Sequence, residues 1–194
     1  MKKIIILISV LLYSCSQGNK PNENYYDSTN LTNYHNVINK LLKEKFKDIE
    51  IVVMETKVVH RGDTLDGSPK IGYAYLNYYA DNKKINTEDV EYIYNQIDST
   101  STIMLDSTKI ETKMMDKNEL HRLFKKNRLN DLKKEGDIKS IATFSTPLFS
   151  KDKSKIIFWV DIWHGPLNAC GYVFIVSQEK GEWKIVEQTC TYIS

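Results

Sequence analysis

The sequence has little of what most often reveals a protein's chemistry. Its 194 residues include three cysteines, four histidines, eight glycines and four prolines. None of the histidines forms an H-x-x-x-H or H-E-x-x-H pair, the spacing that aligns two zinc ligands on a helix. The sequence also contains no phosphate-cradling glycine loop, no dinucleotide fingerprint and no G-x-S-x-G nucleophile motif. These absences predict no metal and no cofactor, and they favour a non-enzymatic protein.

A strong excess of charge is also missing. Lys and Arg total 27 against 25 acidic residues, and removal of Lys2 and Lys3 with an N-terminal leader would leave 25 of each. Nucleic-acid binding depends on clustered cations that neutralise phosphates. The densest basic cluster, at 125–128, falls in a segment with helical periodicity and is interpreted as a solvated face. No nucleic acid is therefore expected among the partners.

Apolar runs of membrane-spanning length are missing as well. The N-terminal run covers Ile4–Leu12, nine residues, whereas a membrane-spanning helix needs about 20. Met1-Lys2-Lys3 gives this run a basic flank, so the segment has the anatomy of a signal peptide. The next residues, Leu12-Tyr13-Ser14-Cys15, resemble the lipobox of bacterial lipoproteins, in which an aliphatic residue and a small residue precede the cysteine. The resemblance implies cleavage before Cys15 and acylation of its thiol and amine.

This resemblance divides the chain into three parts. Residues 1–14 are expected to be the signal peptide, 15–29 the lipidated cysteine and a flexible tether, and 30–194 a single α+β domain. The lipid would anchor the protein to a bacterial membrane in the cell envelope, on the periplasmic side or at the surface. The alternative is an ordinary secreted protein that is cleaved nearby.

Periodic patterns predict about three helices. The first starts at Asn30 or Thr32 and runs to about Lys47, the second follows a capping signal at Asn86, and the third follows one at Asp116. Strand-like segments are expected at 49–59, 71–79, 102–105 and 138–144. This order predicts an α+β fold with a mainly antiparallel sheet and the helices packed on one side of it.

The C-terminal quarter predicts a three-stranded meander. Residues with β-branched and aromatic side chains mark strands at 155–163, 170–177 and 183–193. Gly181 suits the positive-φ position of the turn before the last strand.

The meander also carries two of the three cysteines. If the last turn has three residues, Cys170 lies opposite Cys190, with about 4.5–5.5 Å between their Cα atoms. That separation suits a disulfide. Because lipidation would occupy Cys15, the other two cysteines could pair in an oxidising compartment. The alternative is a pair of small buried thiols.

The same region resembles a group of uncharacterised lipoproteins of the Bacteroidetes. The resemblance rests on Pro147-Leu148-Phe149-Ser150, on Cys170-Gly171 and on Gly181-Glu182-Trp183-Lys184. These residues match a P-x-F-S segment, a hairpin with cysteine and glycine, and a G-x-W-K strand. The resemblance implies a shared fold and an envelope location, and it implies no activity.

One strand of the meander predicts a candidate binding face. Side chains of a strand alternate between the two faces of its sheet. The even-numbered residues from Ile156 to Ile162 are all apolar and predict a core face. The odd-numbered residues are mixed, and they either bind a ligand or pack against another layer. With the following loop, the candidate ligand-binding residues are Trp159, Asp161, Trp163 and His164.

These features lead to competing hypotheses about function. The preferred one is a lipid-anchored envelope module without catalytic activity that binds an envelope protein or a glycan. The first alternative is a small cell-wall hydrolase that uses the His164 loop, with Asp161 and Cys170 as further candidates. The second alternative is an immunity or inhibitor lipoprotein. Tyrosines at 73, 75, 78 and 79 are interpreted as packing on a sheet rather than stacking on sugars, and Arg61-Gly62-Asp63 as a charged turn rather than an adhesion motif.

Overall fold

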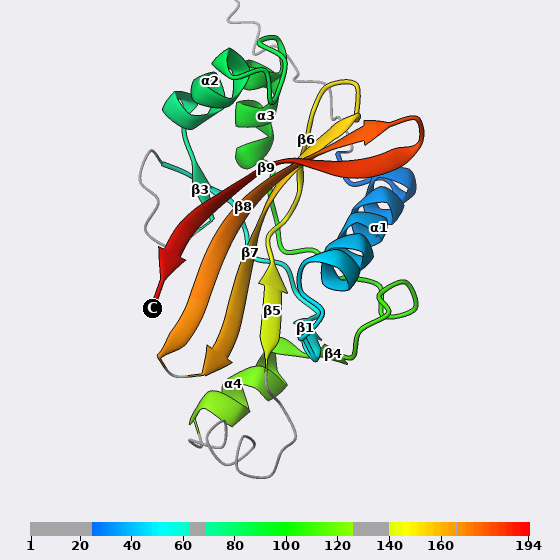
Figure 1. The fold of residues 1–194 in the computed structure, drawn as a ribbon, viewed down its shortest axis with the longest axis vertical. Coiled ribbons are helices and arrows are strands. Elements are labelled where there is room, and N and C mark those ends of the chain that lie inside the picture. Colours follow the sequence, from blue (N-terminus) through cyan, green and yellow to red (C-terminus); the bar gives the residue numbers. More distant parts are fainter. Residues whose placement is uncertain (1–24, 63–68, 126–139, 166) are drawn as a thin grey trace, which may run out of the picture.

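The structure, a computed structural model, describes residues 25–62, 69–125, 140–165 and 167–194 (Figure 1). The helices in these residues are α1 (Ser28–Glu44), α2 (Tyr73–Asp81), α3 (Asp89–Ile97) and α4 (Lys117–Lys125). The strands are β1 (Ile51–Val53), β2 (His60–Arg61), β3 (Lys70–Ile71), β4 (Met114–Met115), β5 (Ile141–Phe144), β6 (Leu148–Phe149), β7 (Lys155–Gly165), β8 (Asn168–Glu179) and β9 (Glu182–Ile193).

The main sheet is mixed, with most of its strand pairs antiparallel. Its strand order is β4-β1-β5-β7-β8-β9, and β6 also pairs with β7. β1 runs parallel to β4 and β5, whereas the pairs from β5 to β9 are antiparallel. β2 and β3 form a separate two-stranded sheet. The predicted α+β class, with a mainly antiparallel sheet that ends in a three-stranded meander, is confirmed.

Helices cover both faces of the meander, so the one-sided arrangement predicted from the sequence was wrong. α1 packs on the face that carries Phe158 and Phe174, while α2 and α3 pack on the face that carries Ile157 and Trp159. Neighbouring residues of a strand point to opposite faces, so the two clusters lie on opposite sides of the sheet. Ile157 and Trp159 make the second face apolar enough to need a cover of its own.

α1 shows how local signals define an element. The Asp27 side chain accepts a hydrogen bond from the Asn30 backbone N–H at 2.8 Å, which caps the helix slightly earlier than predicted. The predicted apolar stripe is confirmed, because its side chains are buried against the sheet: Tyr34, Val37, Ile38, Leu41 and Leu42. The predicted second and third helices are found as α3 and α4.

The chain enters the domain at the end of the sheet away from α4 (Figure 1). The Tyr25 ring lies 5.8 Å from the Tyr92 ring of α3. Lys153, in the turn between β6 and β7, places its Nζ 5.5 Å from the centre of the Tyr25 ring and 4.9 Å from that of Tyr92. These aromatic and cation–π contacts connect the start of the domain to the β6–β7 turn.

The predicted signal peptide and Cys15 lie outside the described residues, so cleavage and lipidation stay predictions. None of the helices within the described ranges has the length and hydropathy needed to cross a bilayer.

The segment 71–79, predicted as a strand, forms α2 instead. Gly72 takes the N-cap position with an extended backbone. Leu76 and Tyr79 are one helical turn apart, and both are buried against the Trp159 face of the sheet. Aromatic residues favour strands because they fit a half-buried sheet surface. Here the tyrosines reach such a surface from a helix, so tertiary packing outweighs local propensity.

The β8–β9 hairpin has a shorter turn than predicted. Its loop consists of Lys180 and Gly181, both with positive φ, and Glu179 pairs with Glu182. The expected role of Gly181 is therefore confirmed, although the loop has two residues rather than three. Two β-bulges then shift the pairing along the strands, the second of them beside Gly171.

This shift makes the predicted alignment of the two cysteines wrong. Cys190 pairs with Tyr172, and Cys170 pairs with Ile193. Both thiols are free. Cys170 shares a hydrogen bond with the Tyr172 hydroxyl, which together with burial raises the pKa of Tyr172 to about 12. The Cys190 thiol donates to the Tyr192 carbonyl at 3.6 Å. A disulfide between the cysteines stays a prediction, without the direct pairing that motivated it.

Candidate functional site

Trp159, predicted as a ligand-binding residue, belongs to the core instead. Its side chain is 2% exposed and packs with Ile157 beneath α2 and α3. This part of the mixed face of β7 therefore follows the alternative interpretation, in which a second layer packs on the strand. The prediction of Trp159 as a site residue was therefore wrong. It failed because all the helices were expected on the other face of the sheet.

Further along β7, Asp161 and Trp163 line an open cleft of about 240 Å³, called the Asp161 cleft below. Its floor is the same face of the sheet that carries Trp159. The end of β7 to which Asp161 and Trp163 belong lies away from α2 and α3 (Figure 1). β5, β7, β8, β9 and α4 all contribute to the cleft. The lining residues are Lys57, Leu120, Ile141, Thr143, Asp161, Ile162, Trp163, Ala169 and Tyr192.

Asp161 is the centre of the polar contacts in this cleft. The Lys57 Nζ donates to the Asp161 Oδ2 in an ion pair, in which the Asp161 side chain is 12% exposed and that of Lys57 45%. The Tyr192 hydroxyl donates a hydrogen bond to the same carboxylate. Burial, together with the Asp161 charge and this hydrogen bond, raises the pKa of Tyr192 to about 12. The tyrosine therefore keeps its proton at neutral pH and remains a donor.

Gly171 makes this arrangement possible. It pairs with Asp161 on one side and with Tyr192 on the other, beside the bulge in β9. A Cβ atom at Gly171 would lie 2.4 Å from the Tyr192 ring and 2.5 Å from the Thr191 Oγ1. Glycine within a strand often marks such a close approach. Because Gly171 has no side chain, the Tyr192 ring can lie over it on the same face of the sheet and reach Asp161 on β7.

Replacement of Gly171 by alanine is expected to displace the Tyr192 ring from the sheet. Tyr192 would lose its hydrogen bond to Asp161 and part of its burial, so its pKa should fall from about 12 toward the usual value of about 10. The titration of the Tyr192 ring carbon by NMR, assigned with Tyr192→Phe, measures this change. Gly181→Ala is the control: alanine strains the turn there because φ is positive, but its Cβ atom meets nothing within 4 Å and so cannot displace the Tyr192 ring. An unchanged Tyr192 pKa in Gly171→Ala would contradict the steric argument.

His164 does not join the Asp161 cleft. Its Nδ1 lies 3.6 Å from the Asp48 Oδ2, in the segment after α1. Cys170 pairs with Ile162 and so belongs to the opposite face of the sheet from Asp161. The structure therefore separates Asp161, His164 and Cys170, and the hydrolase alternative loses the constellation on which it was based. In the described part of the chain, no group of three or more His, Cys, Asp or Glu side chains converges as metal ligands.

Three polar residues of the cleft were not found from the sequence. Lys57 comes from a segment 104 residues before Asp161, and no short-range pattern connects them. Thr143 and Tyr192 reach the cleft through the strand register. Gly171 was the available signal, because a glycine inside an otherwise β-branched and aromatic strand indicates a close contact.

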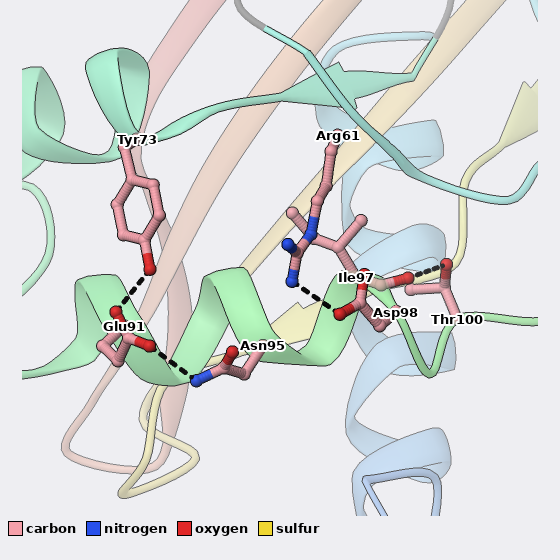
Figure 2. Close-up of polar contacts among 7 residues, drawn as sticks. All are labelled: Arg61, Tyr73, Glu91, Asn95, Ile97, Asp98 and Thr100. Carbon is pink, nitrogen blue, oxygen red and sulfur yellow. Dashed lines mark hydrogen bonds and ion pairs between the residues drawn. The ribbon is translucent and has the colours of Figure 1, made fainter.

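A second polar cluster lies between α3 and the segments that carry Arg61 and Tyr73 (Figure 2). The Arg61 guanidinium lies 4.1 Å from the centre of the Tyr94 ring and donates to the Asp98 Oδ2 at 2.6 Å. The Tyr73 ring stacks on Tyr94 with 3.8 Å between centroids. The Tyr73 hydroxyl donates to Glu91, which raises the pKa of Tyr73. These contacts join α2 and β2 to α3.

This cluster is best explained as a structural connection. Glu91 also accepts a hydrogen bond from Asn95 at 3.0 Å, and the Thr100 hydroxyl donates to the Ile97 carbonyl at 2.9 Å, near the end of α3 (Figure 2). Arg61, the first residue of the Arg-Gly-Asp tripeptide, is thus held against α3. Asp63 lies outside the described residues.

Comparison of the chain with protein-family models, with curated proteins and with solved structures found no match. The functional argument therefore depends on the geometry of the Asp161 cleft.

Proposed function

We propose that this protein is a lipid-anchored cell-envelope protein that binds a glycan in the Asp161 cleft without altering it chemically. The observation that carries the proposal is the contact of Asp161 with both Lys57 and Tyr192 in a hollow bordered by Trp163. The lipobox resemblance at Leu12–Cys15 supports the anchor and the envelope location. The protein would need no cofactor for this role.

The chemistry of the cleft suits sugar hydroxyls. Each hydroxyl can donate one hydrogen bond and accept others. Asp161 supplies acceptors, Lys57 supplies donors, and the protonated Tyr192 can do both. Hydrogen bonds with a charged partner are the strong ones, and Asp161 is largely shielded from water. The half-buried Trp163 adds an aromatic surface for the apolar face of a sugar ring.

The shape of the cleft favours a small unit over a flat protein surface. Small-molecule sites are concave and carry a few placed polar groups among apolar ones, whereas protein interfaces spread over a large area. A hollow of about 240 Å³ is smaller than the usual ligand site of about 300–1,000 Å³, so it has room for a single small unit. A glycan presents units of this size, and an envelope protein remains the competing partner.

Binding of the full chain, purified from membranes in mild detergent, to a glycan array that includes peptidoglycan fragments tests the proposal. Asp161→Asn should weaken the affinity by roughly 10- to 100-fold, since a hydrogen bond to a charged group contributes about 1.5–3 kcal/mol. Asp98→Asn is the matched control, because Asp98 also pairs with a cation, Arg61, but lies outside the cleft.

Two results would contradict the proposal. One is a wild-type chain that binds no glycan on the array, and the other is an Asp161→Asn variant that binds as well as the wild type. Recovery of a stoichiometric protein partner whose binding Asp161→Asn abolishes would assign the cleft to protein recognition instead.

A further inference from the structure

A second hollow, called the tyrosine pocket below, opens between α2 and β9. It has a volume of about 470 Å³ and is lined by Ala74, Tyr75, Tyr78, Tyr79 and Thr189. Tyr78 is 59% exposed, whereas Tyr79 is 2% exposed and forms the inner side. The two rings lie 5.7 Å apart at 63° to each other. The pocket thus offers aromatic surface in two orientations.

Two hydroxyl groups also border the tyrosine pocket. The Tyr79 hydroxyl donates to the Thr189 Oγ1 at 3.5 Å, the outer limit of a hydrogen bond. So long a contact leaves both hydroxyls with capacity to bond a ligand. The tyrosine pocket therefore combines aromatic rings with hydrogen-bonding groups, as expected for a sugar unit that stacks and is held in place.

The tyrosine pocket and the Asp161 cleft lie on the same face of the sheet. Thr189 pairs with Val173, and Val173 pairs with Trp159, so Thr189 faces α2. The Tyr192 ring lies over Gly171 and points toward Asp161. Asp161 belongs to the same face of β7 as Trp159.

The two hollows are also close along β9. The β8 partners of Thr189 and Tyr192, Val173 and Gly171, are two residues apart, because the bulge takes up the extra residue of β9. Thr189 and Tyr192 are therefore about 7 Å apart along the strand. The half-buried Thr191 lies between them, with its Oγ1 directed toward Gly171. A hydroxyl group therefore lies between the polar cleft and the aromatic pocket.

We propose that the Asp161 cleft and the tyrosine pocket are two subsites of one groove along β9, which binds a linear oligosaccharide. The inference rests on the proposed function, and it adds the class of glycan. The Asp161 cleft holds one sugar unit through charged hydrogen bonds. The tyrosine pocket stacks on a unit further along the same chain.

A contact at the far end of β9 favours a glycan over an added peptide strand. The Lys84 Nζ donates to the Val186 carbonyl at 3.1 Å and pairs with Glu187 at 3.0 Å. An extended peptide would need the backbone groups of this edge strand, and Lys84 already occupies one of them. A glycan needs side chains and aromatic surface, which the groove supplies.

The test measures the affinity of the full chain, in detergent, for N-acetylglucosamine oligomers from the monosaccharide to the hexasaccharide by titration calorimetry. The affinity of the wild type is expected to rise with length until the groove is filled. Tyr78→Ala should lower the hexasaccharide affinity by about two- to tenfold and leave the monosaccharide affinity unchanged. Asp161→Asn should lower the affinity at every length.

Tyr73→Ala is the matched control, because Tyr73 is an exposed tyrosine of the same helix whose ring stacks on Tyr94 outside the pocket. Circular dichroism verifies that each variant is folded. Equal affinity at all lengths, or a Tyr78→Ala variant that matches Tyr73→Ala, overturns the extended groove and leaves the single cleft standing. A wild type that binds none of these oligomers overturns the inference, while the array experiment still decides the proposed function. Preferential binding to an extended peptide overturns it as well.

Discussion

Replacement of Phe158 by alanine is expected to lower the free energy of unfolding by about 3–5 kcal/mol. Phe158 is in the middle of β7 and is 0% exposed. Its ring stacks on Phe174 at 5.8 Å and meets the Tyr34 ring edge-on at 5.4 Å. The substitution removes these ring contacts together and leaves a cavity between α1 and the sheet. Since the total free energy of unfolding of a small domain is about 5–15 kcal/mol, this loss is a large share of it.

Urea unfolding followed by far-ultraviolet circular dichroism measures this loss. Phe46→Ala is the matched control, because Phe46 is half-buried at the margin of the same cluster and contacts Phe174 at 5.9 Å. Its loss of stability should be clearly smaller. Equal losses in the two variants would show that the core does not depend on Phe158 as the packing indicates.

Replacement of Cys15 by serine is expected to move the protein almost completely from the membrane to the soluble fraction. In the lipoprotein interpretation, Cys15 carries all the acyl chains. Each buried CH₂ contributes about 0.8 kcal/mol to the free energy of membrane binding. Several acyl chains therefore hold a protein firmly in the membrane, whereas a single chain binds only marginally.

Membrane fractionation with an alkaline wash, followed by mass spectrometry of the N-terminal peptide, measures this change. Cys170→Ser is the control, since Cys170 lies in the folded domain and its loss should leave the protein in the membrane fraction. A wild-type protein that is soluble and cleaved at another position would support the secreted alternative. A Cys15→Ser variant that stays in the membrane fraction although its leader has been removed would contradict the lipid anchor.

The elements that the sequence predicts well depend on local signals. The buried stripe of α1 recurs at helical spacing, and its side chains are where that spacing puts them. Gly181 takes the positive-φ position of a tight turn. The even-numbered residues of β7 form a core face, as strict alternation requires. In each case the information lies within a few neighbouring residues.

The parts that the sequence did not predict depend on contacts between distant segments. The shorter turn and the bulge between Ile175 and Val176 change the partner of Cys190, and the bulge beside Gly171 then changes the partner of Cys170. The local sequence pattern is almost the same with and without these shifts. Trp159 is buried because α2 covers it, and α2 was itself expected to be a strand. Asp161 and Trp163 were found, whereas Lys57 required knowledge of how β1 lies beside β5. Strand register and helix placement therefore limit how much of the site the sequence alone reveals.

The contact of Tyr25 with Tyr92 and Lys153 fixes the point at which the domain would be joined to a lipid on Cys15. β7 starts beside Lys153 and reaches Asp161 after six residues, a span of about 20 Å. The end of the domain that follows the tether would thus lie nearest to the lipid, and the Asp161 cleft would open at a distance from the headgroups. Such a distance suits polymers that run above a membrane surface.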